Sequence, residues 1–268
     1  MTGVRRSDAG LDAVAAAGLD TQRADATDPD SLAALPDADW VVFAASSGGR
    51  GAEAAREVYV EGLRNVIDAY AARDATPDRL VYTSSTGVDE EPPIDPTTEK
   101  TAVLAEAERI AREDAAAAGI DGTVARFAGL YGPNRYRLDR YIEGPVTEGY
   151  LNMVHRDDAA GAIAFLLESE LARDSIVLVA DDEPADKWTF ADWLAAECGV
   201  EAPSKRTIEA RLADSDLSEA ATRRLQTSKR CDNSRLRDLG YEFAYPTFRE
   251  GYRAAIDAYR DGTPASDV

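Results

Sequence analysis

Short apolar runs alternate with longer alanine-rich stretches along most of the chain. Runs rich in β-branched and aromatic residues are typical of strands, whereas apolar residues three or four positions apart are typical of helices. The pattern predicts strands over residues 1–4, 19–24, 40–45, 79–84, 122–127 and 175–180. It predicts helices over residues 11–17, 52–72, 99–118 and 158–169, a brief helix with Asp28 as N-cap, and mostly helical structure after Trp188.

The run from Trp40 to Ala45, WVVFAA, is continuously apolar, which predicts a parallel strand buried on both faces. Strands that alternate with helices at this spacing argue for a parallel sheet covered by helices on both sides. In such sheets ligands bind at the carboxyl ends of the strands. The residues that follow each predicted strand are therefore the candidates for binding and chemistry.

The net charge of the chain is strongly negative, and it limits the partners that the protein can bind. The 268 residues include 50 acidic and 30 basic side chains, a net charge of −20, and only four of the basic residues are lysine. A dense carboxylate surface fits a protein kept soluble at high salt, which we favour, although an ordinary acidic cytosolic protein is the alternative. Nucleic acid and anionic membranes are poor partners for such a surface.

The chain has two distant cysteines and one histidine. This composition predicts neither a disulfide framework nor a zinc site and suits a reducing compartment, so we expect a cytoplasmic protein. No apolar run approaches the length of a membrane span, and no apolar leader is visible, so we expect no membrane partner.

Three segments carry a family resemblance. YTSSTGV at residues 82–88, RFAGLYGP at 126–133 and NMVHRDDAA at 152–160 occur in this order. Together with residues 239–251, they resemble the extended and atypical short-chain dehydrogenase/reductases, the NAD(P)-dependent epimerase/dehydratase family. The resemblance implies a Rossmann-like, doubly wound parallel sheet over residues 1–180. It also implies a small helical substrate lobe over residues 181–268, with loop 131–153 contributing, and a homodimer formed through two long helices.

The first predicted strand matches the second strand of that family. Members begin with a strand, a glycine-rich turn and a helix, but this chain contains no G-x-G-x-x-G. We therefore expect an α/β fold that lacks its first strand and glycine-rich turn, and we favour a mis-assigned start codon over a real loss. An intact mass of the native protein well above 28.8 kDa would support this expectation.

The cofactor expected from the strand ends is NADP. Arg5 and Arg6 end the first strand, where NAD-specific sites place an acid and NADP sites place an arginine; a pair of solvated surface arginines is the alternative. The resemblance implies that Asp25 and Ala26 line the adenine. It places further cofactor contacts at Ala44, Ala45, Ser46, Thr83, Ser84, Phe127, Gly129 and Leu130.

The family's catalytic set is a serine or threonine and a Tyr-x-x-x-Lys pair on a helix. Ser85 matches the serine, but no tyrosine lies between Tyr82 and Tyr131, so the pair is missing. Lys100 falls where the tyrosine stands and Leu104 where the lysine stands. Lys100 becomes a candidate acid or base if desolvation lowers its pKa, and an exposed lysine at a helix start is the simpler interpretation.

A substrate loop is expected after residue 130. Its candidate contacts are Tyr131, Asn134, Arg135 and His155. An arginine fork matches phosphate oxygens, so Arg135 suits a sugar-nucleotide phosphate, although plain surface charge explains it equally well. His155, at the head of a helix, is expected to organise this loop rather than to act in catalysis.

Three functions remain open. The first is an NADP-dependent oxidoreductase or epimerase/dehydratase that acts on a nucleotide sugar or a similar small molecule. The second is a non-catalytic NADP-binding sensor or regulatory protein on the same fold, which the missing Tyr-x-x-x-Lys pair favours. The third is a fragment without a ligand.

Overall fold

We analysed a computed structural model that describes residues 1–48, 51–86, 99–214, 216–226 and 228–262. The chain divides into two compact units. Unit 1 comprises residues 1–126 and 163–177, and unit 2 comprises residues 127–162 and 178–268. These units divide the chain at other residues than the predicted domains 1–180 and 181–268, because residues 127–162 join the C-terminal part.

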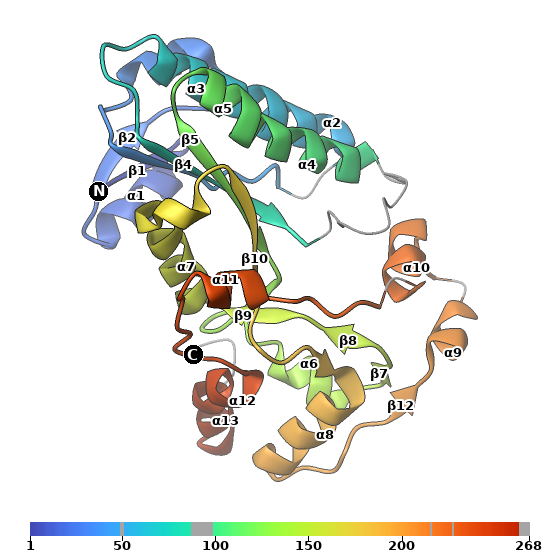
Figure 1. Ribbon diagram of the computed structural model, residues 1–268. Coiled ribbons are helices and arrows are strands. Elements are labelled where there is room, and N and C mark those ends of the chain that lie inside the picture. The colour runs from blue at the N-terminus through green and yellow to red at the C-terminus, as the bar shows by residue number, and fades with distance from the viewer. Residues whose placement is uncertain (49–50, 87–98, 215, 227, 263–268) are drawn as a thin grey trace. The chain divides into compact units, whose positions relative to one another are not determined.

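Unit 1 alternates strands and helices from its first residues (Figure 1). Its strands are β1 (Thr2–Arg5), β2 (Asp20–Arg23), β3 (Trp40–Phe43), β4 (Arg79–Ser85) and β5 (Asp121–Phe127). Its helices are α1 (Asp8–Ala16), α2 (Ala52–Arg56), α3 (Gly62–Ala71), α4 (Glu99–Arg109) and α5 (Ala115–Ala117), with 3-10 turns η1 (Pro29–Ala34) and η4 (Glu170–Ala172). Asp28 accepts a hydrogen bond from the Asp30 backbone N–H, which confirms it as the N-cap of η1.

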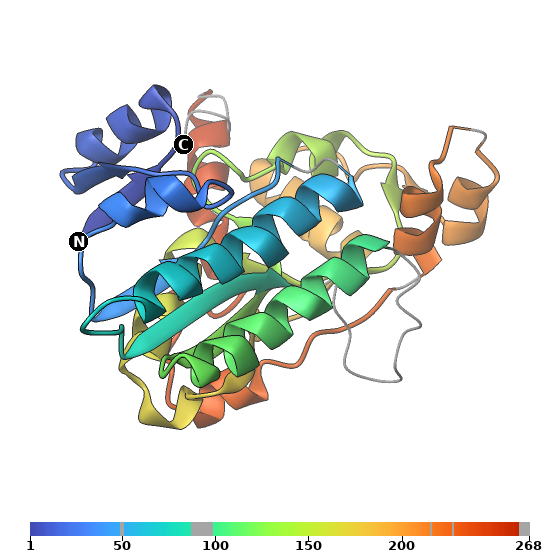
Figure 2. The same cartoon turned by 90° about the horizontal axis from the view of Figure 1, so that it is seen from above.

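The two long helices expected from the sequence are present, and each contains a π-helical turn. In α2–α3 this turn is η2 (Glu57–Glu61), and in α4–α5 it is η3 (Ile110–Asp114). The two run side by side along one face of the central sheet (Figure 2). A Cβ on Gly122 of β5 would lie 1.7 Å from the Ala111 carbonyl oxygen, so glycine is what allows η3 to approach the sheet.

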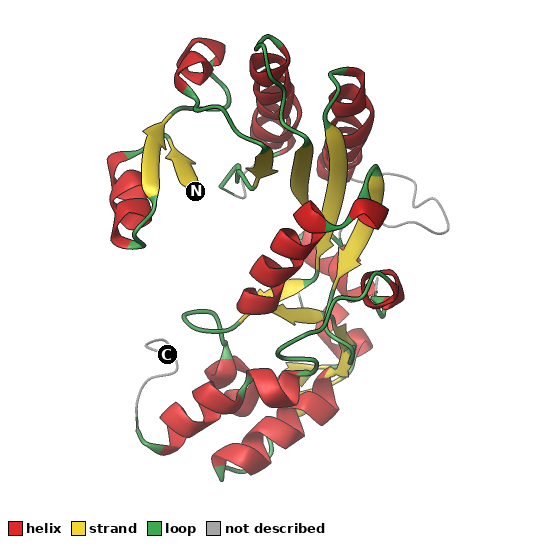
Figure 3. Cartoon of the chain, turned by 60° about the vertical axis from the view of Figure 1, so that its left-hand side comes forward, coloured by secondary structure: helices red, strands yellow, loops and turns green. Residues whose placement is uncertain are grey.

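The strands of unit 1 form two separate sheets. The central parallel sheet has the order β10-β5-β4-β3, where β10 is Ser175–Val179. Strands β1 and β2 pair only with each other, in parallel, with Arg5 opposite Arg23. Figure 3 shows this pair standing apart from β3, with no strand of the described residues between them. The expected α/β fold with a parallel central sheet is thereby confirmed.

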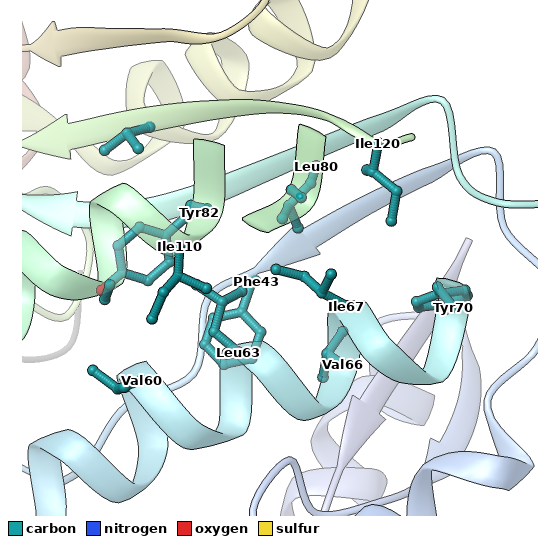
Figure 4. Close-up of a cluster of buried hydrophobic side chains, with 14 of the residues drawn as sticks. Phe43, Val60, Leu63, Val66, Ile67, Tyr70, Leu80, Tyr82, Ile110 and Ile120 are labelled. Atoms are coloured by element: carbon teal, nitrogen blue, oxygen red, sulfur yellow. The ribbon is translucent and has the colours of Figure 1, made fainter. Parts of the chain in front are cut away.

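The core of unit 1 lies between the central sheet and α2–α3 with α4–α5 (Figure 4). Leu63 and Ile110 project from the helices toward Phe43, Leu80 and Tyr82 of the sheet, and all five are at most 5% exposed. This arrangement explains the apolar spacing of the two helices, because the buried positions recur every three or four residues.

The prediction that Trp40 to Ala45 is buried on both faces was wrong. Val41 and Phe43 pack into the core, but Trp40 is 47% exposed and Val42 is 42% exposed. Alternate side chains of a strand point to opposite faces, and β3 is the last strand of its sheet. Its second face therefore stays open in the described structure, which the apolar run alone could not reveal.

Unit 2 is built from short strands and helices. Its strands are β6 (Gly129–Tyr131), β7 (Val146–Thr147), β8 (Tyr150–Leu151), β9 (Met153–His155), β11 (Ala185–Asp186) and β12 (Lys205–Arg206). Its helices are α6 (Leu138–Glu143), α8 (Lys187–Cys198), α9 (Ile208–Leu212), α10 (Glu219–Gln226), α11 (Ser234–Asp238), α12 (Phe248–Gly251) and α13 (Arg253–Arg260). Helix α7 (Arg156–Glu168) and β10 belong to both units. None of the described helices is both long and apolar enough to cross a bilayer.

Candidate functional site

Three arginines meet at the carboxyl end of β1 and β2. Arg5 and Arg6 were predicted, and the parallel register adds Arg23 opposite Arg5. Arg23 donates to the Arg6 carbonyl oxygen at 2.8 Å and forms an ion pair with Asp8, while the Arg6 side chain is 68% exposed. Guanidinium groups match phosphate oxygens, so this edge of unit 1 suits a phosphate monoester. The sequence missed Arg23 because strand register is not visible in it.

The turn after β2 is fixed from both sides. Asp25 accepts hydrogen bonds from the backbone N–H of Thr27 at 3.0 Å and from its hydroxyl at 2.9 Å. These bonds, the backbone one foremost, lower the pKa of Asp25, and Arg6, 3.6 Å away, adds to the effect. Asn65 of α3 donates to the Ala26 carbonyl oxygen at 2.9 Å. Both predicted adenine-lining residues thus sit in a hydrogen-bonded turn.

The loop after β3 is exposed at Ala44, Ala45 and Ser46, where the cofactor was expected. The Ser47 backbone N–H donates to the Tyr59 hydroxyl at 3.2 Å, and Tyr59 comes from the π-helical turn η2. The π-helical turn η2 thus places the Tyr59 hydroxyl where it hydrogen-bonds this loop.

Neighbouring serines at the end of β4 face opposite ways. Ser84 is buried, and its hydroxyl donates a hydrogen bond to the Glu108 carboxylate of α4 at 2.6 Å. The Arg126 guanidinium of β5 donates two hydrogen bonds to the same carboxylate, at 2.9 and 2.6 Å. Ser85 is exposed, as its catalytic prediction needs. Thr83 donates to the Phe43 carbonyl oxygen at 3.4 Å. Ser84 therefore anchors the strand, and its predicted contact with the cofactor stays a prediction.

The other catalytic candidate, Lys100, lies in the first turn of α4, and its side chain falls outside the described residues. Glu108, which sequence reasoning missed, lies two turns further along the helix from it. The spacing 100, 104, 108 places all three positions on one helix face, but it does not show that Glu108 meets Ser84 and Arg126 of the sheet.

In unit 2 the structure brings two predicted substrate residues together. Strands β6 and β9 pair in parallel with Tyr131 opposite His155, and the two rings meet edge to face with centroids 5.4 Å apart. Both side chains are at most 3% exposed. The predicted cofactor residues Gly129 and Leu130 on β6 are exposed, and Phe127 is half-buried.

The surroundings of His155 disfavour its charged form. Burial, opposed by Asp157 and Asp158, lowers its pKa. Its Nδ1 accepts from the Asp157 backbone N–H at 3.3 Å, and its ring lies 3.8 Å from that of Tyr245. Asn134 and Arg135 lie in an exposed turn, with the Arg135 N–H donating to the Gly132 carbonyl oxygen. The organising role of His155 and the substrate contacts of all three residues stay predictions.

A buried carboxyl group that the sequence did not point to lies at the end of β10. Asp181 is 2% exposed, and neither carboxylate oxygen accepts a well-formed hydrogen bond among the described residues. Burial raises its pKa to about 8, with nearby Asp182 and Glu183 adding to the rise. Asp158, equally buried, instead accepts from the backbone of Ala244 and Tyr245 at 2.8 Å. A strand end followed by DDE was the available signal.

Among the described residues, no group of three His, Cys, Asp or Glu side chains is placed to hold a metal ion.

The chain belongs to the NAD(P)H-binding family, whose model matches residues 1–170. It is 28% identical to Protein YeeZ of Escherichia coli strain K12 over 262 residues, covering 92% of this chain and 88% of that protein. It is 34% identical to the 3-diazoavenalumate denitrifying reductase of a Streptomyces species over 160 residues, 55% of this chain and half of that enzyme. The predicted relationship of this chain to the epimerase/dehydratase-like short-chain dehydrogenase/reductases is confirmed.

The fold also matches a solved enzyme. The structure of UDP-glucose 4-epimerase from Thermotoga maritima, with UDP-glucose, superposes with a TM-score of 0.73 at 15% identity, over 97% of this chain and 91% of that one. At that identity the likeness shows the fold alone. The chain therefore has an NAD(P)-binding, oxidoreductase- and epimerase-like fold.

Proposed function

We propose that the protein is an NADP-dependent oxidoreductase or epimerase/dehydratase acting on a small molecule, a nucleotide sugar or a related polyol. The observation that carries the choice of NADP is the cluster of Arg5, Arg6 and Arg23 at the end of β1 and β2. An acid in that place would accept a ribose hydroxyl, whereas arginines suit the 2′-phosphate that distinguishes NADP. The substrate class is the one that the resemblance to the epimerase/dehydratase family implies, and it is part of the proposal.

We expect the described residues to hold the adenosine half of the cofactor. Arg5 and Arg6 would bind the 2′-phosphate, with Arg23 holding the Arg6 backbone; the fixed turn at Asp25 and Ala26 would line the adenine. Ala44 to Ser46 offer exposed backbone for the remainder. The cofactor supplies hydride transfer, and Ser85 would orient the reacting oxygen of the substrate.

The double substitution Arg5→Ala/Arg6→Ala is expected to weaken NADPH binding by about 10–100-fold and to leave NADH binding nearly unchanged. The reason is that a hydrogen bond to a charged group contributes roughly 1.5–3 kcal/mol. Fluorescence titration of both nucleotides into protein purified from its native cells measures this.

The matched control is Arg64→Ala/Arg109→Ala, which removes the same charge from surface ion pairs of unit 1. Equal losses for NADPH and NADH, or a wild type that binds neither, would overturn the proposed cofactor role.

A non-catalytic NADP-binding sensor is the second candidate, and one observation favours it. Tyr82 is the last tyrosine before the segment in which the catalytic tyrosine of the family is expected. Its side chain is 1% exposed, and its hydroxyl has no hydrogen-bond partner among the described residues. Tyr82 therefore does not replace the proton-transferring tyrosine of the missing Tyr-x-x-x-Lys pair. A sensor needs the arginine cluster but not Ser85.

Ser85→Ala separates the two candidates. In the enzyme we expect NADPH oxidation with a panel of nucleotide sugars to fall at least about 100-fold, as is typical for loss of a group that orients or transfers protons, with NADPH affinity unchanged. Ser204→Ala, an exposed serine of unit 2, is the control. Turnover equal in both variants and the wild type contradicts the role of Ser85, and no turnover in any of them supports the sensor.

A further inference from the structure

The proton donor missing from the predicted catalytic set has a candidate elsewhere in unit 1. Reduction of a carbonyl group needs an acid beside the substrate oxygen, and a tyrosine hydroxyl is one of the groups that supplies it. Three of the 11 tyrosines lie in unit 1: Tyr59, Tyr70 and Tyr82. The position of each hydroxyl decides which of them suits a site at the strand ends, where Ser85 lies.

Two of these hydroxyls are unsuited to that site. Tyr70 is 6% exposed and donates to the Pro36 carbonyl oxygen at 3.2 Å, at the other end of β3, ahead of its first residue. Tyr82 is 1% exposed, and its hydroxyl has no hydrogen-bond partner among the described residues. Neither hydroxyl is therefore open to a substrate at the carboxyl edge of the central sheet.

The Tyr59 hydroxyl lies at that carboxyl edge. It accepts hydrogen bonds from the Ser47 backbone N–H at 3.2 Å and from the Ser47 hydroxyl at 3.3 Å, in the loop that follows β3. The Tyr59 side chain is half-buried and packs against the core of unit 1. The core thus holds the apolar ring, while the polar tip faces the loop.

The predicted catalytic serine leaves the same edge from the neighbouring strand. Strands β3 and β4 pair in parallel with Phe43 opposite Tyr82, and Thr83 donates to the Phe43 carbonyl oxygen at 3.4 Å. Beyond this pair, β4 continues to the exposed Ser85, and β3 continues into the loop that Tyr59 contacts. Ligands of parallel sheets bind at such an edge, where adjacent strands end.

The helix that carries Tyr59 is irregular at this point. Tyr59 is the central residue of η2, the five-residue π-helical turn between α2 and α3. Such turns are rare inside α-helices and are frequent at functional sites. The two bonds from Ser47 also suit proton transfer, because donors aimed at a phenol oxygen stabilise the ionised form that remains after the proton has left.

We propose that Tyr59 is the proton-transferring catalytic residue and acts on the substrate oxygen that Ser85 orients. In reduction, the substrate carbonyl carbon takes the hydride of a reduced nicotinamide, which is left oxidised, and the carbonyl oxygen takes the proton of the Tyr59 hydroxyl. The product is an alcohol. The remaining tyrosinate regains a proton from water through the Ser47 hydroxyl, since a hydroxyl both donates and accepts. This role rests on the proposed enzyme function and deepens it.

Tyr59→Phe tests the proposal, because phenylalanine keeps the packed ring and removes the proton. With NADPH and nucleotide sugars that carry a ketone, kcat is expected to fall at least about 100-fold while KM stays within about twofold. The matched control is Tyr82→Phe, which removes a buried hydroxyl from the same unit and is expected to keep the wild-type turnover. Wild-type turnover in Tyr59→Phe, or an equal loss in both variants, overturns the proposal.

Fluorescence titration with NADPH distinguishes proton transfer from a purely structural role. If Tyr59 only holds the loop after β3, Tyr59→Phe loosens a segment that is expected to contact the cofactor, and NADPH binds more weakly. If Tyr59 transfers the proton, the variant is expected to bind NADPH like the wild type although its turnover is lost. A loss of affinity as large as the loss of turnover contradicts the proposal.

The proposed function and the role of Tyr59 fail in different ways. A wild-type protein that binds NADPH but reduces none of these sugars removes the enzyme, and the role of Tyr59 with it, and supports the sensor. Turnover that depends on Ser85 but not on Tyr59 leaves the enzyme in place and refutes only the role of Tyr59.

Discussion

Replacing Glu108 with glutamine is expected to lower the free energy of unfolding by about 3–5 kcal/mol. Glu108 is 3% exposed, Arg126 is 6% exposed, and the carboxylate accepts two bonds from the guanidinium and one from Ser84. A neutral side chain in its place leaves the Arg126 charge buried without compensation, and that penalty exceeds what the bonds themselves contribute. Urea denaturation of the two proteins at neutral pH measures the difference.

Glu113→Gln is the matched control. Glu113 lies in the same helical run and pairs with Arg109 at 3.1 Å, but its side chain is 61% exposed, so the expected loss is below about 1 kcal/mol. The pair Glu108→Leu/Arg126→Met should recover part of the stability that Glu108→Gln loses, since it removes both buried charges. Similar losses in the Glu108 and Glu113 variants would show that the ion pair is not energetically important.

How much of this could be predicted from the sequence depends on how local each feature is. The long helices over residues 52–72 and 99–118 were predicted to within a residue or two, because their apolar spacing repeats over five turns. The short strands β6 to β9 were not predicted, since two or three residues carry no period and their pairing depends on distant partners such as β11 and β12.

The candidate site shows the same difference between local features and features that depend on distant contacts. Arg5, Arg6 and Ser85 could be found because they follow strands that the sequence marks clearly. Arg23 and Glu108 could not, because one depends on strand register and the other on a helix crossing the sheet. The exposure of Trp40 is a case in which the sequence predicted too much burial. An apolar run predicts a strand, but it does not show which neighbours cover that strand.

Asp181→Asn is expected to stabilise the protein at neutral and alkaline pH, on the order of 4 kcal/mol at pH 7. Asp181 has a pKa of about 8 when folded, against the ordinary value of 3.8, so between these values the folded state holds a proton that the unfolded state has released. Stability from this group therefore falls as pH rises from about 4 to about 8. Asparagine keeps the shape and cannot ionise, so the variant escapes that loss.

The neighbouring carboxylate provides a control of opposite sign. Hydrogen bonding to Arg237 lowers the pKa of Asp182, so its contribution is present at neutral pH and is lost as pH falls below its ordinary value. Its side chain is about one-third exposed, and solvent screening limits the effect of Asp182→Asn to about 1 kcal/mol. Thermal unfolding from pH 4 to 9 is expected to show Asp181→Asn gaining on the wild type as pH rises, while Asp182→Asn loses. A difference between Asp181→Asn and the wild type that does not change with pH would mean that Asp181 is already ionised, and that a cation or a cluster of donors compensates it inside unit 2.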